Sequence, residues 1–173
     1  MASILAAAEA EVAAGEYDVF LSHAWVGGRR APLTLEVYQR LRDAGLRVWL
    51  DTDMGANFEA SMREGVSKSK CMVALMSQHY STRPNCLKEL LYAKEQHKPV
   101  IGCFTEPGVG RAWWDTPELQ QLIDPAVSNM PNLVPAASVD WEVQGGAPAA
   151  ERDKLTQFAD ALPKLLRLVR AAI

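Results

Sequence analysis

The sequence predicts an α/β protein with a flavodoxin-like, doubly wound, five-stranded parallel sheet and helices on both faces. Short apolar runs alternate along the chain with helical segments, the pattern of right-handed βαβ units. The run over residues 71–76 is apolar throughout, as is typical of a strand buried on both faces. Ligands of such folds bind beyond the carboxyl ends of the strands, so the segments after each strand are candidate binding segments.

Three strands and two helices are expected in the first half of the chain. The strands cover residues 17–22, 46–50 and 71–76, which are short apolar runs bounded by polar or Gly-containing segments. The first helix begins at Pro32 and ends before Gly45. Its apolar residues recur at helical spacing at Leu33, Val37, Leu41 and Ala44. The second helix has its apolar residues four positions apart, at Phe58, Met62 and Val66.

The second half continues the alternation. We expect a helix over 86–96, a strand over 99–104, a short helix over 117–124 and a fifth strand starting at Leu133. A long helix over about 150–172 ends the chain. Its apolar residues recur three or four positions apart, at Leu155, Phe158, Leu162, Leu165 and Val169.

Composition narrows the functional class. The chain has 173 residues, is 49% hydrophobic and 23% charged, and has a formal net charge of −3, which is typical of a globular domain. This balance argues against a basic nucleic-acid surface and a polybasic membrane-binding segment. No apolar run approaches the roughly 20 residues of a membrane span. The three cysteines form no CxxC pair, and residues 1–15, an Ala-rich helix or tail, lack a secretory signal. We therefore expect a reduced, cytoplasmic protein.

Several site chemistries are absent from the strand ends. The chain has neither the dinucleotide motif GxGxxG nor the P-loop GxxxxGK[ST]. Ser22-His23 and Ser77-Gln78 follow the first and third strands, where a Mg²⁺-dependent phosphoacceptor domain needs acidic residues. The histidines lack metal-ligand spacing, and no GxSxG motif is present. We expect no metal and no cofactor.

Glu89 is the most informative acidic residue. If Leu87, Leu90 and Leu91 form the core-facing stripe of the helix over 86–96, Glu89 points about 150° away from its centre. One interpretation is a solvated glutamate. The other is a carboxylate near the start of the helix that faces a cleft, is kept ionised by the helix dipole and stabilises a developing cation. Periodicity alone leaves both open.

Three ordered motifs resemble those of the Toll/interleukin receptor (TIR) domain family. Residues 16–23, EYDVFLSH, resemble the family's opening strand motif YDVFLS. Residues 46–70, LRVWLDTDMGANFEASMREGVSKSK, resemble its second strand, BB loop and following helix. Residues 77–90, SQHYSTRPNCLKEL, resemble the plant and bacterial segment S..Y..S.WCL.EL. The resemblance extends over roughly residues 16–140 and implies that residues 16–173 form a TIR domain that includes the C-terminal helix.

The resemblance implies an activity. Many plant, bacterial and neuronal TIR domains cleave the nicotinamide–ribose bond of NAD⁺ with a glutamate on the third helix, and Glu89 matches that position. NAD⁺ would be the substrate, and defence or cell-death signalling the context. Nicotinamide leaves from a cationic pyridinium without a general acid, and a carboxylate can stabilise the oxocarbenium-like ribosyl centre. Attack by water gives ADP-ribose, and attack by the adenosine part of the substrate gives a cyclic isomer.

Two other functions remain open. Many animal receptor-type TIR domains are non-catalytic adaptors or scaffolds that signal through TIR–TIR self-association. Similarly folded nucleoside deoxyribosyltransferases also act on N-glycosidic bonds, but of other substrates. Self-association is expected for the enzyme as well, with no nucleic-acid or membrane partner.

Further substrate-binding residues follow from the resemblance. His23, Ala24 and Trp25 match the first loop, which lines the pocket of the family. His23 and Trp25 can stack on nicotinamide or ribose, although Trp25 as a core residue is equally compatible with its position. Asp51, at the end of the second strand, can hydrogen-bond a ribose hydroxyl or cap the loop that follows.

The remaining expected site residues lie on later segments. Asn85 stands where family enzymes often have tryptophan, and Cys86 matches the cysteine three residues before the glutamate, where packing is its alternative role. Trp113 can stack on adenine or anchor its own loop. The loop that matches the BB loop, which gates the site and mediates assembly in the family, contains Asp53, Gly55 and Asn57.

Overall fold

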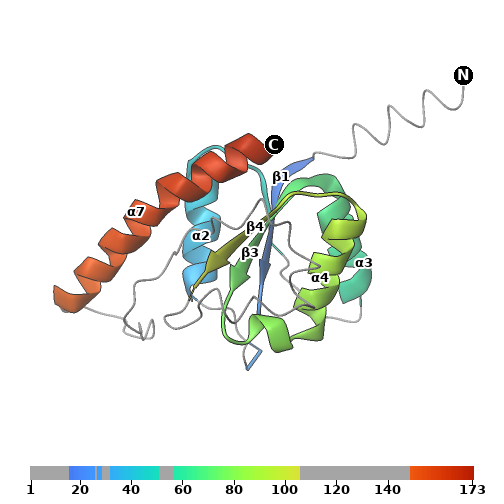
Figure 1. Ribbon diagram of the computed structural model, residues 1–173, viewed down its shortest axis with the longest axis horizontal. Coiled ribbons are helices and arrows are strands. Elements are labelled where there is room, and N and C mark those ends of the chain that lie inside the picture. The colour runs from blue at the N-terminus through green and yellow to red at the C-terminus, as the bar shows by residue number, and fades with distance from the viewer. Residues whose placement is uncertain (1–15, 26, 29–31, 51–56, 106–148) are drawn as a thin grey trace, which may run out of the picture.

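The computed structural model describes residues 16–25, 27–28, 32–50, 57–105 and 149–173. The predicted N-terminal lead (1–15), the short helix over 117–124 and the fifth strand from Leu133 lie outside the described residues. Within those residues the protein is an α/β fold with a parallel sheet between two layers of helices (Figure 1). The predicted fold class is therefore confirmed.

The sheet places strands that are distant in sequence side by side. Among the described residues it contains, in spatial order, β2 (Val48–Leu50), β1 (Tyr17–His23), β3 (Ser69–Met76) and β4 (Val100–Phe104). All three pairings are parallel, and one register row runs through Leu50, Leu21, Val73 and Ile101. The carboxyl ends of β1, β3 and β4 consequently meet at one edge of the sheet.

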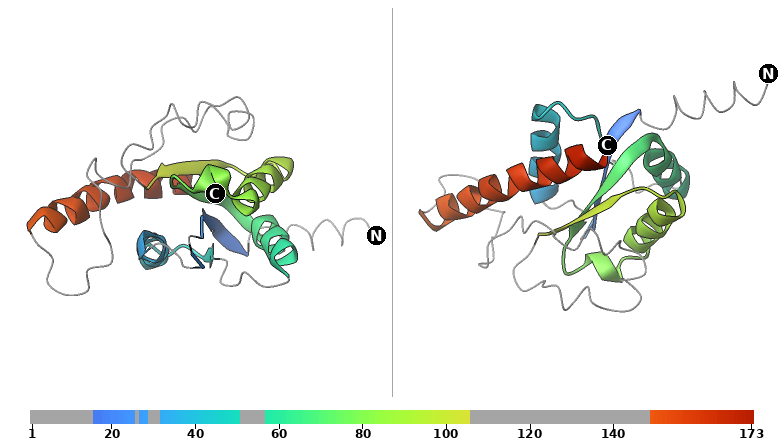
Figure 2. Two further views of the ribbon diagram at one scale, coloured as in Figure 1. Left: turned by 90° about the horizontal axis from the view of Figure 1, so that it is seen from below. Right: turned by 45° about the horizontal axis from the view of Figure 1, so that its top comes forward.

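One face of the sheet is covered by α2 (Pro32–Asp43) and α7 (Ala149–Ala172), as Figure 2 shows. Their side chains pack onto β-strand residues of one parity, including Val19, Leu21 and Val73. The predicted helical stripes supply this core with Leu33, Val37, Leu41, Leu165 and Val169.

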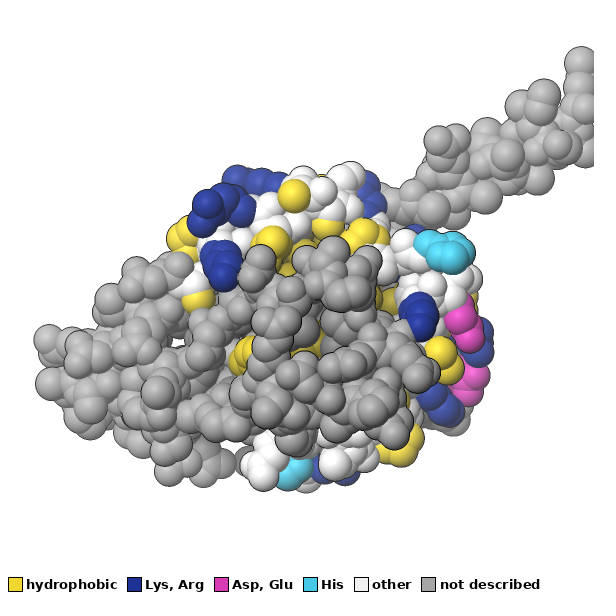
Figure 3. All heavy atoms as spheres, in the orientation of Figure 1, with side chains coloured by type: hydrophobic (Ala, Val, Ile, Leu, Met, Phe, Trp, Pro, Cys, Tyr) yellow, Lys and Arg dark blue, Asp and Glu magenta, His cyan; other side chains and the backbone are white. Residues whose placement is uncertain are grey.

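The opposite face is covered by α3 (Phe58–Lys68) and α4 (Pro84–Glu95) (Figure 2). Here Phe20, Met72 and Ala74 of the strands contact Met62 and Val66 of α3 in a second core cluster. The outer surfaces of these two helices carry charges of both signs (Figure 3). Ion pairs there join Glu59 to Arg63 and to Lys88. This side of the molecule therefore carries both acidic and basic side chains rather than charges of a single sign.

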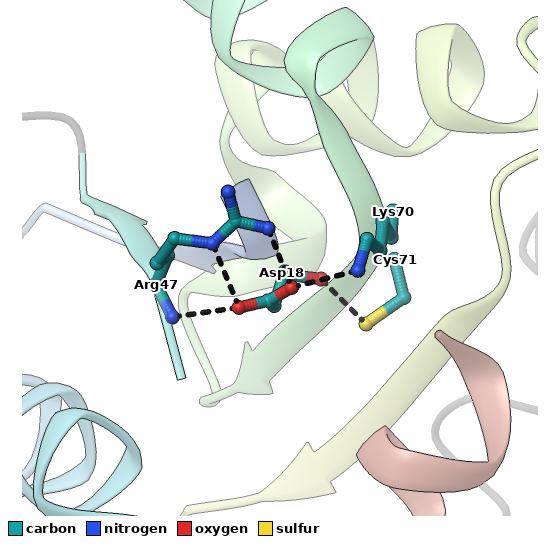
Figure 4. A network of polar contacts seen from close by, with 4 residues as sticks. All are labelled: Asp18, Arg47, Lys70 and Cys71. Carbon is teal, nitrogen blue, oxygen red and sulfur yellow. Dashed lines mark hydrogen bonds and ion pairs between the residues drawn. The ribbon is translucent and has the colours of Figure 1, made fainter. Parts of the chain in front are cut away.

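The amino ends of three strands are joined by ionic contacts around Asp18 (Figure 4). Arg47 donates to the Asp18 carboxylate from its backbone N (2.9 Å), Nε (3.2 Å) and Nη2 (3.0 Å). Lys70 Nζ lies 3.0 Å from the same carboxylate, and the Cys71 thiol donates to the Asp18 carbonyl oxygen. The hydrogen bonds from Arg47 hold the pKa of Asp18 well below its usual range. This network ties β1, β2 and β3 together at the end of the sheet away from the predicted site.

The predicted boundaries differ from the structure at two places that bear on function. The predicted loop after β3 contains a 3₁₀ helix, η1 (Tyr80–Thr82). Helix α4 begins at Pro84, earlier than predicted, since proline suits the first helical turn. Glu89 therefore lies beyond the first turn, where the helix dipole has fallen off, so the predicted dipole contribution to its ionisation is wrong.

The predicted core stripe of α4 is confirmed at Leu90, which is buried, and at Leu87, which is partly buried and packs against the core, but it is wrong at Leu91. The buried residues of the helix are Cys86, Glu89, Leu90 and Ala93. Leu91 is 47% exposed, whereas Glu89 is 5% exposed. The helix is rotated relative to the leucine-based prediction because the carboxylate of Glu89 has hydroxyl partners inside the fold. The interpretation of Glu89 as a solvated residue is thus excluded.

No helix in the described ranges combines the length and apolar character that crossing a membrane requires. Within those ranges there is also no group of three or more His, Cys, Asp and Glu side chains placed to hold a metal ion.

Candidate active site

The candidate site lies at the carboxyl end of β1, on the side of the sheet covered by α4. Ser22 is the second-last residue of β1 and pairs in register with Ala74 of β3. Tyr80 comes from η1, which follows β3, and Glu89 comes from α4. Three segments that are separate in sequence therefore deliver polar side chains to the edge of the sheet where parallel α/β folds bind ligands.

A chain of hydrogen bonds joins these three side chains. The Ser22 hydroxyl donates to Oε2 of Glu89, and its oxygen also contacts the Tyr80 hydroxyl. A serine hydroxyl has a single proton. Because that proton is given to the carboxylate, the Tyr80 hydroxyl is the donor to Ser22. The order of donation is thus Tyr80 to Ser22 to Glu89.

These groups are removed from water. Ser22 is 1% exposed, Tyr80 is fully buried and Glu89 is 5% exposed. Burial, together with the nearby Cys86 and Glu89, raises the pKa of Tyr80 well above its usual value. Tyr80 therefore keeps its proton near neutral pH, as its role as donor requires.

Cys86 adjoins this group and is buried in the core. It is 3% exposed, and its thiol donates to the backbone carbonyl of His23 over 3.6 Å. Burial and the proximity of Glu89 raise the pKa of the Cys86 thiol. A neutral thiol is a poor nucleophile, and the expected role of Cys86 in substrate binding stays a prediction beside its packing in the core.

The residues expected to line the first loop are placed next to Ser22. His23 and Ala24 are buried, and Trp25 is half-buried. The rings of His23 and Trp25 lie 5.6 Å apart and are tilted by 38°. The thiol of Cys86, near the amino end of α4, is hydrogen-bonded to the His23 carbonyl, and Ala24 lies in the same core cluster as Cys86.

Other predicted residues are not part of this buried group. Asn85 is exposed in the first turn of α4, and Asn57 is exposed immediately before α3. Their expected roles in binding and assembly stay predictions. The other predicted site and loop residues, Asp51, Asp53, Gly55 and Trp113, lie outside the described residues.

Sequence reasoning missed Ser22 and Tyr80. Ser22 is the last residue of the YDVFLS motif and the only polar residue among residues 19–22, which is a signal for an inward-facing hydroxyl. Tyr80 belongs to the S..Y..S segment but sits in what the sequence predicts as a loop. Neither pattern indicates that the two hydroxyls meet, because 58 positions separate them.

The arrangement is suited to stabilising positive charge. A carboxylate held by a hydroxyl donor in a site depleted of water interacts more strongly with a developing cation than it would in solvent. Because the donor comes from a strand paired on both sides, the carboxylate needs little reorganisation when that charge appears.

Known proteins resemble this chain in sequence and structure. The model of the TIR domain family matches residues 19–129. The probable 2′ cyclic ADP-D-ribose synthase BdTIR of Brachypodium distachyon is 34% identical over 91 residues, which are 51% of this chain and 40% of that protein. The NAD(+) hydrolase TcpA of Theionarchaea archaeon (strain DG-70-1) is 35% identical over 92 residues, 50% of this chain and 27% of that protein. The matched region thus spans well under two thirds of either relative.

A solved structure gives a similar comparison. The TIR domain of the Toll-related receptor TRR-2 from Hydra magnipapillata superposes with a TM-score of 0.49 at 17% identity, covering 89% of this chain and 98% of that one. The family model matches more than half of the chain, in the region that carries β1 to β4 and Glu89. The chain therefore belongs to the TIR domain family.

Proposed function

We propose that this protein cleaves NAD⁺ at the nicotinamide–ribose bond, with Glu89 as the catalytic carboxylate. The observation that carries the proposal is the burial of Glu89 at the carboxyl end of β1, where the Ser22 hydroxyl donates to it. Burying a carboxylate has a desolvation cost even when hydrogen bonds offset part of it, and ionisable groups buried in this way are often found at functional sites.

The related proteins support the same chemistry. Both relatives that match about half of this chain are named for reactions of NAD⁺ or its cyclic ADP-ribose product. Each match is about 35% identical, and the family match includes Glu89. The proposal extends the chemistry in those names to this chain.

The reaction can be written from the site. The bond between ribose C1′ and the pyridinium nitrogen breaks, and both electrons go to nicotinamide, which leaves as a neutral molecule. Positive charge then develops on C1′ and the ring oxygen of ribose, where the Glu89 carboxylate stabilises it. Attack by water on C1′ releases one proton and gives ADP-ribose. Attack by a nucleophile of the adenosine part instead gives a cyclic ADP-ribose isomer and also releases one proton.

The test is to measure nicotinamide release from NAD⁺ by chromatography at a series of protein concentrations. The series is needed because the TIR–TIR self-association that we propose would make turnover per molecule rise with concentration. Glu89→Gln keeps the size of the side chain and removes its charge, and should lower turnover by about a hundredfold or more. Glu95→Gln is the matched control, since Glu95 is an exposed glutamate on the same helix.

Two results would overturn the proposal. If the wild-type protein releases no nicotinamide at any concentration while sedimentation shows self-association, the adaptor function is the better explanation. If Glu89→Gln and Glu95→Gln are equally active, the reaction does not use Glu89. A panel of nucleosides in the same assay identifies an enzyme that acts on N-glycosidic bonds of other substrates.

A further inference from the structure

The Glu89 carboxylate accepts a hydrogen bond from the Ser22 hydroxyl, which is in turn contacted by the Tyr80 hydroxyl, and both hydroxyls belong to other elements. Ser22 lies 67 positions before it on β1, and Tyr80 lies on η1. We propose that Ser22 and Tyr80 are positioning residues whose hydroxyl chain keeps the Glu89 carboxylate ionised and in one orientation at the carboxyl end of β1. The proposal rests on the NAD⁺-cleaving function proposed above for Glu89.

Both hydroxyls are fixed in place by the fold. Ser22 pairs with Ala74 on β3, and its neighbour Leu21 pairs with strands on both sides, so the backbone under the short serine side chain is held. The Tyr80 ring is fully buried in the core cluster beneath α3 and α4. Its backbone N donates to the Ser77 carbonyl over 3.0 Å. A donor chain built on such rigid supports restricts the carboxylate that it binds.

Two titratable groups close to Glu89 stay protonated. The titratable groups that influence Glu89 include the Tyr80 phenol of η1 and the Cys86 thiol of α4. Burial raises the pKa of both the Tyr80 phenol and the Cys86 thiol, so both stay protonated near neutral pH. The Ser22 hydroxyl then serves as a neutral donor, which favours the charged form of the carboxylate.

A positioning role and a packing role make different predictions. Without the Ser22 proton, Glu89 would bind a proton more readily and would lose its fixed orientation. The acid limb of the pH profile for nicotinamide release should then move to higher pH by about one to two units. kcat should fall by about tenfold or more while KM for NAD⁺ changes little. A packing role predicts lower stability with an unchanged pH profile.

The variants separate these effects. Ser22→Ala removes the donor to Glu89 and also removes Ser22 as a partner of the buried Tyr80 hydroxyl. The double variant Ser22→Ala/Tyr80→Phe removes both hydroxyls of the chain together, so that neither loses its partner within the chain while remaining buried. Tyr80→Phe alone keeps the Ser22 donor and should shift the acid limb by less than Ser22→Ala. Ser69→Ala is the matched control, because Ser69 is equally buried on β3 and donates to the Gly65 carbonyl rather than to Glu89.

A second readout makes the test independent of enzyme activity. Titration of the ¹³C-labelled carboxyl groups by NMR, with the Glu89 signal assigned by its loss in Glu89→Gln, gives the ionisation midpoint of Glu89 without substrate. The midpoint should rise in Ser22→Ala and in the double variant, and should be unchanged in Ser69→Ala. Equal midpoints in the wild-type and double-variant proteins would overturn the positioning proposal. If the midpoint rises in these variants as expected but the wild-type protein releases no nicotinamide, the proposed function is overturned instead.

Discussion

Gly65 of α3 allows the indole ring of Trp49 on β2 to lie against the helix. A β-carbon built at position 65 would lie 2.4 Å from Nε1, 2.6 Å from Cε2 and 2.7 Å from Cδ1 of Trp49. The indole is also held on another side by Tyr17, with ring centroids 5.0 Å apart and an interplanar angle of 88°. The close approach of ring and helix backbone therefore depends on the absence of a side chain at Gly65.

Two opposing effects decide what Gly65→Ala does to stability. Alanine in a helix interior is favoured over glycine by about 1 kcal/mol. An ordinary carbon contact is about 3.5–4.0 Å, so the ring or the helix would have to move by about 1 Å. Overpacking a filled core costs about 1–3 kcal/mol, and a rigid indole fixed by Tyr17 favours the upper part of that range. We expect Gly65→Ala to lower the free energy of unfolding by about 1–2 kcal/mol.

Urea denaturation followed by far-UV circular dichroism measures this change. The midpoint should fall in Gly65→Ala while the slope of free energy against urea stays the same. Trp49→Ala provides the matched background, because it removes the ring atoms that the new β-carbon would meet. In that background Gly65→Ala should be neutral or stabilising. A higher midpoint for Gly65→Ala in the presence of Trp49 would refute the reasoning.

Three further predictions concern packing and ionisation. Leu90→Ala should lower the free energy of unfolding by about 2–5 kcal/mol because Leu90 is fully buried, whereas Leu91→Ala should change it by less than about 0.5 kcal/mol; equal effects in urea denaturation would contradict the observed rotation of α4. The pKa of Asp18 is lowered in the fold, so its stabilising contribution is present above its ordinary value near 3.8 and is lost as pH falls below it. Asp18→Asn should therefore be less stable than wild type at pH 7, with a difference that shrinks in Tm measurements below about pH 4; a constant difference would argue against the Arg47 contacts as the cause. Burial raises the pKa of Cys71 to about 12, and all three cysteines are buried. A disulfide reagent at pH 8 should therefore react slowly with the native protein and fully after unfolding in guanidinium. Fast reaction of one thiol in the native protein would contradict this and show local opening.

Much of the fold follows from local sequence patterns. The runs that predict β1, β3 and β4 are short and apolar, and the stripes that predict α2 and α3 recur at helical spacing, so each element indicates its own buried side. Strand β2 begins two residues later than predicted, at Val48, because Arg47 donates its side chain and backbone N to the Asp18 carboxylate. Strand β3 begins two residues earlier than predicted, at Ser69. Where the spacing of apolar residues matches the period of the strand or helix, the predicted element and the observed element agree.

The sequence by itself determined the βαβ alternation, the motif positions and Glu89 as the acidic residue of interest. Only the tertiary structure decided which way α4 faces, because a leucine stripe counts apolar residues and cannot register hydroxyl partners supplied by another strand. Those partners offset the cost of burying a carboxylate, so Glu89 is inside while Leu91 is exposed. The positions of Ser22 and Tyr80 in the site were likewise decided by the tertiary structure. Their role depends on parallel pairing that brings together hydroxyls 58 positions apart, and no local pattern contains that information.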